Sequence, residues 1–373
     1  MINKKSIKRI SLYEPYIGII EKKYVNECLN TNWISSKGKY VKLFEDRFKN
    51  YIKVKHAISI CNGTAALHVA LLALGIGPKD EVITPTFTYI ATVNSISYVG
   101  AKIKFVDSKI STWQVDENEI EKSINSKTKA ILIPHLYGQS CEVLKIKKIC
   151  KKYNLFLIED CAEAFGTYYK KTHVGTFGDI ATFSFFGSKT ITTGEGGMVV
   201  TNNSSLAKKV EELKMVGNDK DKYYWHNIIG YNYRMTNICA AIGYGQLTRA
   251  KKIIKRKRNI FQTYKKNLMG LPLKMHEEQK GTIHSFWVVS ISLNNFKLRD
   301  KLREYLKFHN IETRPTFYPI HTMKMYKKNI YNNKFLNAVK IGRSGIILPS
   351  GPKLLNSQIN FVCKTISNFF SNN

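Results

Sequence analysis

Short apolar runs alternate with longer amphipathic stretches along the first half of the chain. The short runs are rich in branched or aromatic residues, which predicts buried strands over residues 55–61, 81–87, 101–107, 128–136 and 155–160. The stretches between them space their apolar residues as helices do, which predicts helices over 63–75, 88–100 and 142–153. This alternation predicts the α/β fold class, with a mainly parallel sheet sandwiched by helices.

The pattern changes along the second half of the chain. Residues 178–186 and 196–202 are predicted to form a hairpin around a glycine-rich connection. Further on we predict a long basic helix over 236–268, a strand over 285–293, a helix over 299–310 and a last helix after Pro352. We therefore expect a large domain, residues 1–245, and a smaller C-terminal α+β domain, residues 246–373.

Composition indicates a cytoplasmic protein. Apolar residues make up 43% of the 373 positions, which is enough for a sizeable core. No apolar run has the length that a membrane span needs, and the N-terminus lacks the apolar segment of a signal peptide. The seven cysteines are scattered without a CxxC pair, which favours reduced thiols and offers no metal-site spacing. We expect no membrane segment and no bound metal.

The chain is strongly basic, with 59 Lys and Arg against 27 Asp and Glu and a formal charge of +32. Such a surface attracts polyanions, so a nucleic-acid-binding protein is one interpretation. The basic residues are spread along the chain, however, and the densest cluster, KKIIKRKRN at 251–259, has the spacing of a solvated helix face. We therefore expect no nucleic-acid partner, although the same field would attract a small anionic substrate.

Residues that follow the predicted strands are the first candidates for function, because parallel sheets bind ligands at that edge. Gly63 and Thr64 open a helix directly after a strand, where free N–H groups bind phosphate, although Asn-Gly also marks ordinary turns. Asp160 ends another strand, where a carboxylate is either functional or a turn or N-cap residue. Phe87 and Tyr89 place aromatic rings at a third strand end.

Lys189 lies in the connection of the predicted hairpin, directly after an aromatic run. Most loop lysines are simply solvated. Lys189, however, has no other charged residue within five positions on either side, in a chain otherwise rich in charge. Apolar surroundings disfavour the ammonium form, lower the lysine pKa and produce a nucleophile for carbonyl groups. Lys189 is therefore a candidate catalytic lysine.

One cofactor unites these candidates. Pyridoxal 5'-phosphate needs a phosphate cradle, a lysine that binds it covalently and a carboxylate beside its ring nitrogen. Thr64, Lys189 and Asp160 offer these three groups in turn, and Tyr89 or Phe87 offers an aromatic cover for the ring. The sequence therefore predicts a pyridoxal 5'-phosphate site at the carboxyl edge of the sheet.

Five motifs resemble, in the same order, those of the DegT-type sugar-nucleotide aminotransferase family, within fold type I of the pyridoxal-phosphate enzymes. They extend over most of the chain: GTAALHVAL at 63–71, DEVITPTFTYIAT at 80–92, IEDCAEAFG at 158–166, GTFGDIATFSFFGSKTITTGEGGMV at 175–199 and YNYRMTNICAAIG at 231–243. The resemblance implies transamination with L-glutamate as the amino donor and a nucleotide-linked keto sugar as the acceptor.

The resemblance also implies roles for residues of the cofactor site. Lys189 matches the lysine that binds the cofactor, Asp160 the partner of the ring nitrogen, and Tyr89 the stacking aromatic residue. Glu163 matches a group near the ring hydroxyl. The positions that match phosphate-binding residues are Gly63, Thr64, Ala65 and Ser184.

Three further positions match residues outside the immediate cofactor site. Asn232 matches a residue that reaches the phosphate of the neighbouring subunit, which implies a homodimer with shared active sites. Arg314 and His321 lie in a segment that is near the sugar nucleotide in relatives, which implies contact with the substrate.

Four segments narrow the resemblance to family members that aminate GDP-4-keto-6-deoxy-D-mannose: residues 13–45, the glutamate of DCAEA, residues 224–237 and residues 312–323. Sister enzymes that act on UDP- or dTDP-linked keto sugars, at C4 or C3, share much of this pattern, so the identity of the sugar stays open.

Ser188 stands where the nearest relatives have Asn, which affects the geometry of the substrate rather than the link to the cofactor. Lys189 separates the chain from related dehydratases, which have histidine there, and from inactive regulators on the same scaffold.

Overall fold

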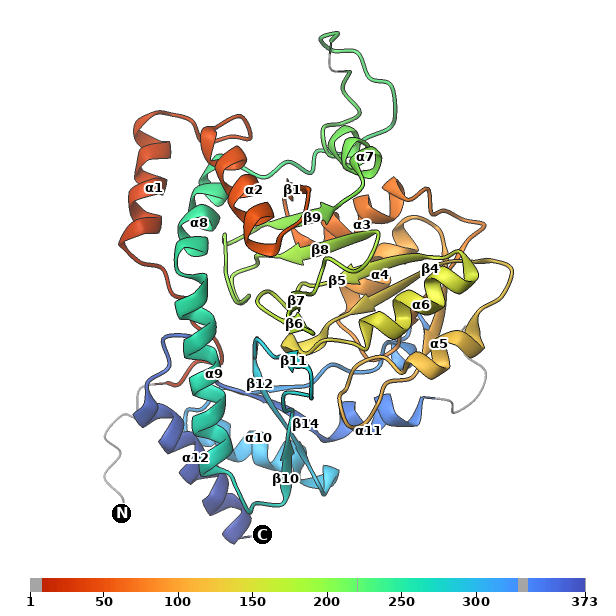
Figure 1. Ribbon diagram of the computed structural model, residues 1–373. Helices are drawn as coiled ribbons and strands as arrows, with labels where there is room; N and C mark the ends of the chain where they lie inside the picture. Colours follow the sequence, from red (N-terminus) through yellow and green to blue (C-terminus); the bar gives the residue numbers. More distant parts are fainter. Residues whose placement is uncertain (1–8, 220, 328–334, 373) are drawn as a thin grey trace.

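The computed structural model describes residues 9–219, 221–327 and 335–372. Within these residues the largest sheet has seven strands, in the spatial order β1-β9-β8-β5-β4-β2-β3 (Figure 1). Their bounds along the chain are β1 His56–Ile60, β2 Glu81–Pro85, β3 Lys102–Val106, β4 Thr128–Pro134, β5 Phe156–Asp160, β8 Ile180–Ser184 and β9 Gly197–Thr201.

The strand directions confirm a mainly parallel sheet. Strands β8, β5, β4, β2 and β3 are parallel to one another, whereas β9 is antiparallel to both β1 and β8. The hairpin predicted around Lys189 is present as β8 and β9, with Ala181 opposite Val200. The carboxyl ends of the parallel strands therefore meet at one edge, where ligands of such sheets bind.

Helices cover both faces of this sheet, as predicted, because its strands are apolar on both sides. In β9, Met198 and Val200 belong to the core on one face, and Val199 belongs to the core on the other. The first face is covered by α2 Lys39–Ile52, α5 Glu117–Ser123, α6 Val143–Tyr153 and α8 Asn237–Thr248, and the second by α3 Gly63–Ala73, α4 Ile90–Tyr98 and α7 Ser204–Lys214.

The prediction of one helix over 236–268 is wrong. The chain instead forms α8 and α9 Ala250–Asn267, which are divided at Arg249. The Arg249 guanidinium pairs with the buried carboxylate of Glu21, in α1 Ile19–Asn30, and lies 4.5 Å from the ring centre of Tyr16. Helix α1 packs beside α8 although the two are far apart in the sequence (Figure 1). This tertiary contact accompanies the break, and the local pattern does not reveal it.

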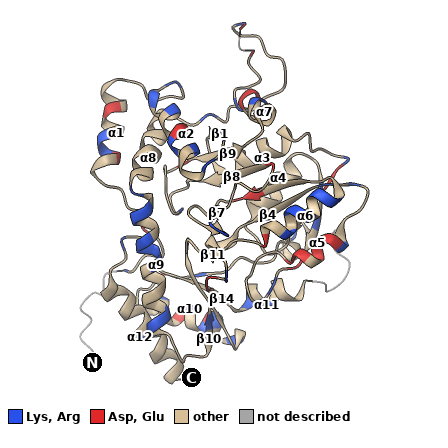
Figure 2. Ribbon diagram, viewed as in Figure 1, with Lys and Arg blue, Asp and Glu red and all other residues tan. Residues whose placement is uncertain are grey.

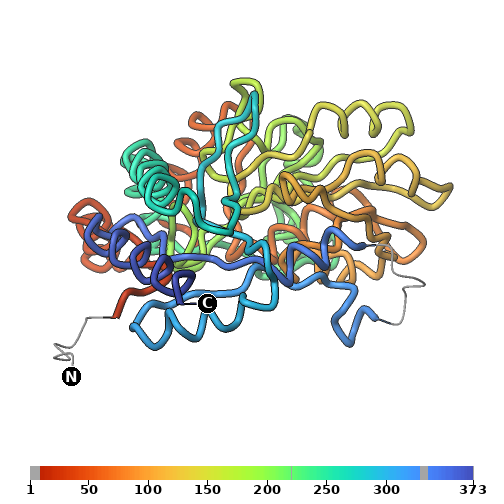
Figure 3. Tube along the Cα trace, turned by 90° about the horizontal axis from the view of Figure 1, so that it is seen from below, coloured from red at the N-terminus to blue at the C-terminus, as the bar shows by residue number. Residues whose placement is uncertain are grey.

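The C-terminal part is built on a second sheet of order β10-β12-β14-β13. Helix α12 packs along α9 at one side of it (Figures 1 and 3). The bounds are β10 Leu273–Met275, β12 Val289–Leu293, β13 Arg314–Pro315, β14 Gly345–Leu348, α10 Arg299–Phe308, α11 Leu336–Ser344 and α12 Asn356–Ser371. A small sheet, β11-β6-β7, pairs Thr282–Ile283 with Tyr168–Tyr169 and these with Thr172–His173.

The strand predicted over 285–293 begins later, at Val289. Phe286 has a left-handed backbone with φ of 48°, and its N–H donates to His284 Nδ1 at 2.8 Å instead of to a neighbouring strand. The Phe286 ring is stacked on Phe261 with ring centres 3.9 Å apart. This packing turns the chain just before β12 and determines where Trp287 lies.

The N-terminal segment contacts the C-terminal part of the chain. Ile10 and Ile311 form a β-bridge, and Ser350 N–H donates to the carbonyl of Leu12 at 2.9 Å. The division into residues 1–245 and 246–373 stays a prediction. The two parts are nevertheless joined by this returning segment as well as by the link between α8 and α9.

The distribution of charge is broad. Figure 2 shows Lys and Arg on helices at distant places in the molecule, including α6 and α9. Among the described residues, the helices are all too short or too polar to cross a membrane.

Candidate functional site

A cavity of about 850 Å³ lies at the carboxyl edge of the large sheet. Its walls come from the residues that follow the parallel strands and from the segments that lead into the second sheet. The lining includes Asn62–Ala65, Thr88–Thr92, Pro134–Leu136, Asp160, Glu163, Ser184, Ser188, Lys189, Trp287 and Arg314–Tyr318. Most of the residues predicted for the cofactor site are therefore brought together here.

Lys189 projects into the cavity with a side chain that is 12% exposed. Its Nζ lies 3.9 Å from a Glu163 carboxylate oxygen and 4.1 Å from the ring centre of Trp287. Burial lowers the pKa of Lys189, whereas the charges of Glu163 and Asp160 act to raise it. The neutral surroundings that the sequence suggested are thus formed in space, with two carboxylates added from another strand end.

Asp160 is the last residue of β5, and its side chain is fixed by two hydrogen bonds. Thr92 Oγ1 donates to Oδ2 at 2.8 Å, and Ala162 N–H donates to Oδ1 at 3.0 Å. Burial raises the pKa of Asp160, and these bonds together with the charge of Lys189 act against that rise. One oxygen therefore closes a local turn while the carboxylate still lines the cavity. Asp160 can thus be both a turn residue and a functional carboxylate.

Glu163 lies three residues beyond Asp160, in the turn that follows β5, and is also buried. Its Oε2 accepts a hydrogen bond from Tyr137 N–H at 2.8 Å. Burial raises the pKa of Glu163 to about 7, despite the opposing charge of Lys189. Near neutral pH this carboxyl group is therefore close to half ionised, and it can exchange a proton with its surroundings.

The start of α3 approaches β8 very closely. A Cβ atom on Gly63 would lie 2.7 Å from the Cβ of Ser184, so a larger residue at 63 would displace one of the two elements. Asn62 caps the helix, with its Oδ1 accepting from Ala65 N–H at 2.8 Å. Thr64 and Ser184 add hydroxyl groups to the cavity wall at this helix start, where anions are favoured.

Of the two aromatic candidates for covering the cofactor ring, Tyr89 lines the cavity; it is 53% exposed, and its ring is tilted against Phe317. Phe87, the other candidate, is completely buried and packs near Trp113 and Tyr137. The alternation of side chains about the strand end therefore leaves Tyr89 as the available ring.

The remaining predicted residues are distributed differently. Arg314, in β13, lines the cavity. His321 is half-buried at the side of Thr86, whose Oγ1 lies 2.8 Å from His321 Nδ1, and it is not part of the cavity wall. Asn232 is exposed and accepts a hydrogen bond from Arg234 Nε at 3.0 Å, also away from the cavity of its own chain.

Several contributors to the cavity were not predicted from the sequence. Thr92 positions Asp160, and Tyr13 donates from its hydroxyl to the carbonyl of Lys189 at 2.7 Å. Trp287 donates from its indole N–H to the carbonyl of Ser188 at 2.7 Å. No local signal marks Tyr13 or Trp287, because both come from segments distant in the sequence.

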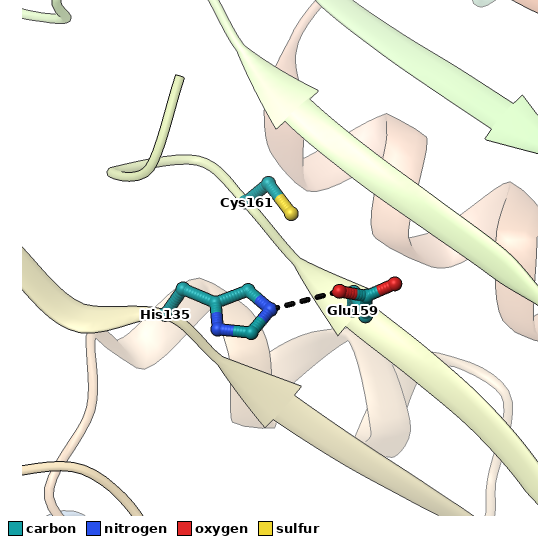
Figure 4. Close-up of side chains that lie close together, drawn as sticks. All are labelled: His135, Glu159 and Cys161. Atoms are coloured by element: carbon teal, nitrogen blue, oxygen red, sulfur yellow. Dashed lines mark hydrogen bonds and ion pairs between the residues drawn. The ribbon is translucent and has the colours of Figure 1, made fainter. Parts of the chain in front are cut away.

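His135, which lines the cavity, forms a buried cluster with Glu159 and Cys161 (Figure 4). Its donor atoms are already used: Glu159 accepts from His135 Nε2 at 3.0 Å and from three backbone N–H groups, of residues 175, 177 and 178. His135 Nδ1 accepts from Cys141 N–H at 3.1 Å. Burial also raises the pKa of the Cys161 thiol, which disfavours the thiolate that a metal needs. The cluster is a hydrogen-bonded support for β4 and β5.

The cavity fits pyridoxal 5'-phosphate. It combines a buried lysine of lowered pKa, a hydrogen-bonded carboxylate at a strand end, and a helix start where glycine permits close approach. These are the groups that the cofactor's carbonyl carbon, ring nitrogen and phosphate require. The fold and this site define a pyridoxal-phosphate-dependent aminotransferase.

Comparisons with known proteins agree. Residues 15–367 match the model of the DegT/DnrJ/EryC1/StrS aminotransferase family, and the chain belongs to that family. It is 52% identical to the GDP-perosamine synthase of Escherichia coli O157:H7, over 98% of this chain and 100% of that protein. Its family and named relatives make it a pyridoxal-phosphate-dependent sugar aminotransferase.

Solved structures show the same fold. Helicobacter pylori PseC, an aminotransferase involved in the biosynthesis of pseudoaminic acid, superposes with a TM-score of 0.93 at 28% identity, covering 98% of this chain and 100% of that one. The PLP form of the putative sugar aminotransferase Spr1654 from Streptococcus pneumoniae superposes with a TM-score of 0.93 at 25% identity, covering 98% of this chain and 99% of that one.

Proposed function

We propose that this enzyme transfers the amino group of L-glutamate to GDP-4-keto-6-deoxy-D-mannose, giving GDP-perosamine. The observation that supports this acceptor is the 52% identity, over nearly the whole chain, to the GDP-perosamine synthase of Escherichia coli O157:H7. Amination of another UDP- or dTDP-linked keto sugar, at C4 or C3, is the alternative within the same chemistry. We place the reaction in the cytoplasm, where its product would supply surface polysaccharide such as O-antigen.

We assign the proton transfer to Lys189. Bound pyridoxal 5'-phosphate supplies an electron sink that acidifies the α-proton of the amino donor. Lys189 holds the cofactor covalently at rest, and its freed amine takes the α-proton and later returns it. Burial lowers the pKa of Lys189, which favours the neutral amine that this task requires.

We assign the remaining cofactor contacts by position. Asp160, held by Thr92, faces the ring nitrogen and keeps it protonated, Glu163 lies by the ring hydroxyl, and Tyr89 covers the ring. The phosphate is held by Gly63, Thr64, Ala65 and Ser184. Because Ala65 N–H already donates to Asn62, Ala65 contributes to the phosphate site by its position in the cavity wall and not by a hydrogen bond from its N–H.

We also propose a homodimer in which Asn232 of the partner subunit completes the phosphate site. The exposed position of Asn232, away from the cavity of its own chain, supports this role. Arg314 lines the cavity and is assigned to the nucleotide sugar. His321 is assigned to the same substrate segment, although its ring is engaged with Thr86.

The acceptor is tested with a panel of GDP-, UDP- and dTDP-linked keto sugars, each incubated with the holoenzyme and L-glutamate. We expect GDP-4-keto-6-deoxy-D-mannose to be aminated fastest, with mass spectrometry identifying the product and NMR placing the amine at C4. Fastest turnover of another sugar would overturn the proposed acceptor but not the transaminase chemistry.

The role of Lys189 is tested on the same assay. Lys189→Arg keeps a cation but is expected to abolish turnover and the absorbance of covalently held cofactor, including the covalent adduct that borohydride reduction fixes. Full activity of this variant would overturn the assigned chemistry whatever the sugar.

A further inference from the structure

Trp287 contacts the candidate catalytic lysine at two points. Its indole N–H donates to the carbonyl of Ser188 at 2.7 Å, directly before Lys189 in the chain. The face of the same ring lies 4.1 Å from Lys189 Nζ. One side chain therefore fixes both the peptide that precedes the lysine and the free end of the lysine itself.

The packing around Trp287 holds its ring in place. Only 9% of the residue is exposed, and its ring is nearly parallel to Tyr137, at 13° and 6.2 Å between centres. Tyr137 is in turn stacked on Phe317 at 5.1 Å. Because the ring is confined by its neighbours, its electron-rich face stays beneath the lysine amine.

The groups that face Lys189 have different effects on its ammonium form. The carboxylates of Glu163 and Asp160 raise the pKa of Lys189, while burial lowers it. On the backbone side lies the Tyr13 hydroxyl, with the buried Lys257 Nζ 3.4 Å behind it. Because the pKa of Glu163 is about 7, its carboxylate balances an ammonium at Lys189 only in part. The aromatic face attracts the ammonium without being able to accept its proton.

We propose that Trp287 is a positioning residue of the transamination, which stabilises the ammonium form of Lys189 after the freed lysine has taken the proton of the donor. When Lys189 takes the α-proton of the donor, a carbon–hydrogen bond breaks and an N–H bond forms, so the amine becomes an ammonium. The ring stabilises that ammonium until the proton is delivered, and the bond to Ser188 keeps Nζ directed into the cavity. This inference rests on the proton-transfer role proposed for Lys189.

The experiment measures the pKa of Lys189 directly in cofactor-free protein. The rate of acetylation of Lys189 by acetic anhydride is followed against pH, with the modified peptide quantified by mass spectrometry. In Trp287→Leu, which removes the ring, we expect the pKa of Lys189 to fall by about half a unit or more. In Trp287→Phe, which keeps a ring face but loses the N–H donor, we expect a pKa close to that of the wild type.

The hydrogen bond to Ser188 has its own readout in the holoenzyme. In Trp287→Phe we expect kcat to fall by roughly tenfold, with KM for the sugar nearly unchanged, because a misdirected lysine affects the chemical step more than binding. Trp113→Phe is the matched control: Trp113 is a buried tryptophan of the same aromatic cluster, stacked on His276 at 4.6 Å, and should change neither value.

An unchanged pKa in Trp287→Leu, or an equal shift in Trp113→Phe, would overturn the role of the ring. If Trp287→Leu does not fold, Trp287→Phe decides alone: a clearly lowered pKa or an undiminished kcat contradicts the inference. The acetylation of Lys189 is measured without any sugar. The proposal for Trp287 and the proposal for the acceptor sugar can therefore fail independently of each other. A shifted pKa without turnover of the GDP sugar overturns only the acceptor, and turnover without a shift overturns only the role of Trp287.

Discussion

At the scale of single residues, two buried carboxyl groups three positions apart are tuned differently. Asp160 accepts hydrogen bonds from Thr92 and Ala162, which act against the rise in pKa that burial causes. Glu163 accepts only the backbone N–H of Tyr137 among the contacts described, and burial raises its pKa to about 7. Two hydrogen-bond donors therefore oppose the effect of burial on the pKa of Asp160, whereas one opposes it at Glu163.

The raised pKa of Glu163 predicts a change of stability with pH. Its pKa in the folded chain, about 7, exceeds its ordinary value of 4.5. The stability that the protonated group contributes is therefore fully present below pH 4.5 and is lost as the pH rises through 7. Glu163→Gln removes this titration, so its melting temperature relative to the wild type should rise between pH 5 and pH 8, by roughly 2 °C or more.

Thermal unfolding of cofactor-free protein at the two pH values checks this expectation. Glu304→Gln, at an exposed position, is the control and should show the same difference from wild type at both. A Glu163→Gln variant that loses stability relative to wild type as the pH rises would show that the ionised carboxylate is favoured in the fold.

At the scale of elements, the junction of α8 and α9 shows how a contact between distant helices interrupts a local pattern. Glu21 is 1% exposed, and its carboxylate accepts from Gln246 Nε2 at 2.7 Å and from Gly18 N–H at 2.9 Å. It also pairs with Arg249, where the helices divide. This one carboxylate therefore joins α1 to both helices. The apolar spacing over residues 236–268 does not predict this contact.

Removal of this carboxylate should be costly. In Glu21→Ala the partly buried Arg249 loses its counter-charge, so we expect the free energy of unfolding to fall by about 3 kcal/mol. Denaturant titration measures the change. Glu119→Ala breaks the exposed pair of Glu119 with Lys122 and should cost less than about 1 kcal/mol. Equal effects of the two substitutions would contradict the role given to Glu21.

At the scale of the whole molecule, the chain between α7 and α8 extends away from the body (Figure 1). Its Tyr223, Tyr224 and Ile229 side chains are 91%, 94% and 89% exposed. Large apolar side chains so exposed are typical of surfaces that meet a partner. They lie in the same segment as Asn232, which supports the proposed dimer with shared sites.

The shared site predicts complementation between inactive variants. In a mixed dimer of Lys189→Ala and Asn232→Ala, one site contains both intact residues. Random pairing of co-expressed chains should therefore restore about a quarter of the wild-type sites. The assay is turnover of the nucleotide sugar by each preparation.

Lys189→Ala paired with Asp160→Asn is the control, because both defects affect the same chain's site and no intact site can form. Activity that does not exceed the sum of the parent variants would show that Asn232 acts within its own subunit or not at the site.

The local pattern of the sequence predicted the strands of the large sheet, three of the helices that cover it (α3, α4 and α6) and the three groups that line the candidate cofactor site. This was possible because apolar periodicity and strand-end residues are local properties, and parallel strands bring their ends to one edge. The neutral neighbourhood of Lys189 was visible for the same reason.

Only the tertiary structure decided the contacts between distant segments. It placed Trp287 beneath Lys189, left Tyr89 rather than Phe87 in the cavity, and broke the helix at Arg249. It also set the pKa of Glu163 at about 7, since burial and neighbouring charge exist only after the chain has folded. The sequence by itself thus determined which candidate residues meet at the edge of the sheet, and packing decided how each is oriented and how its pKa is shifted.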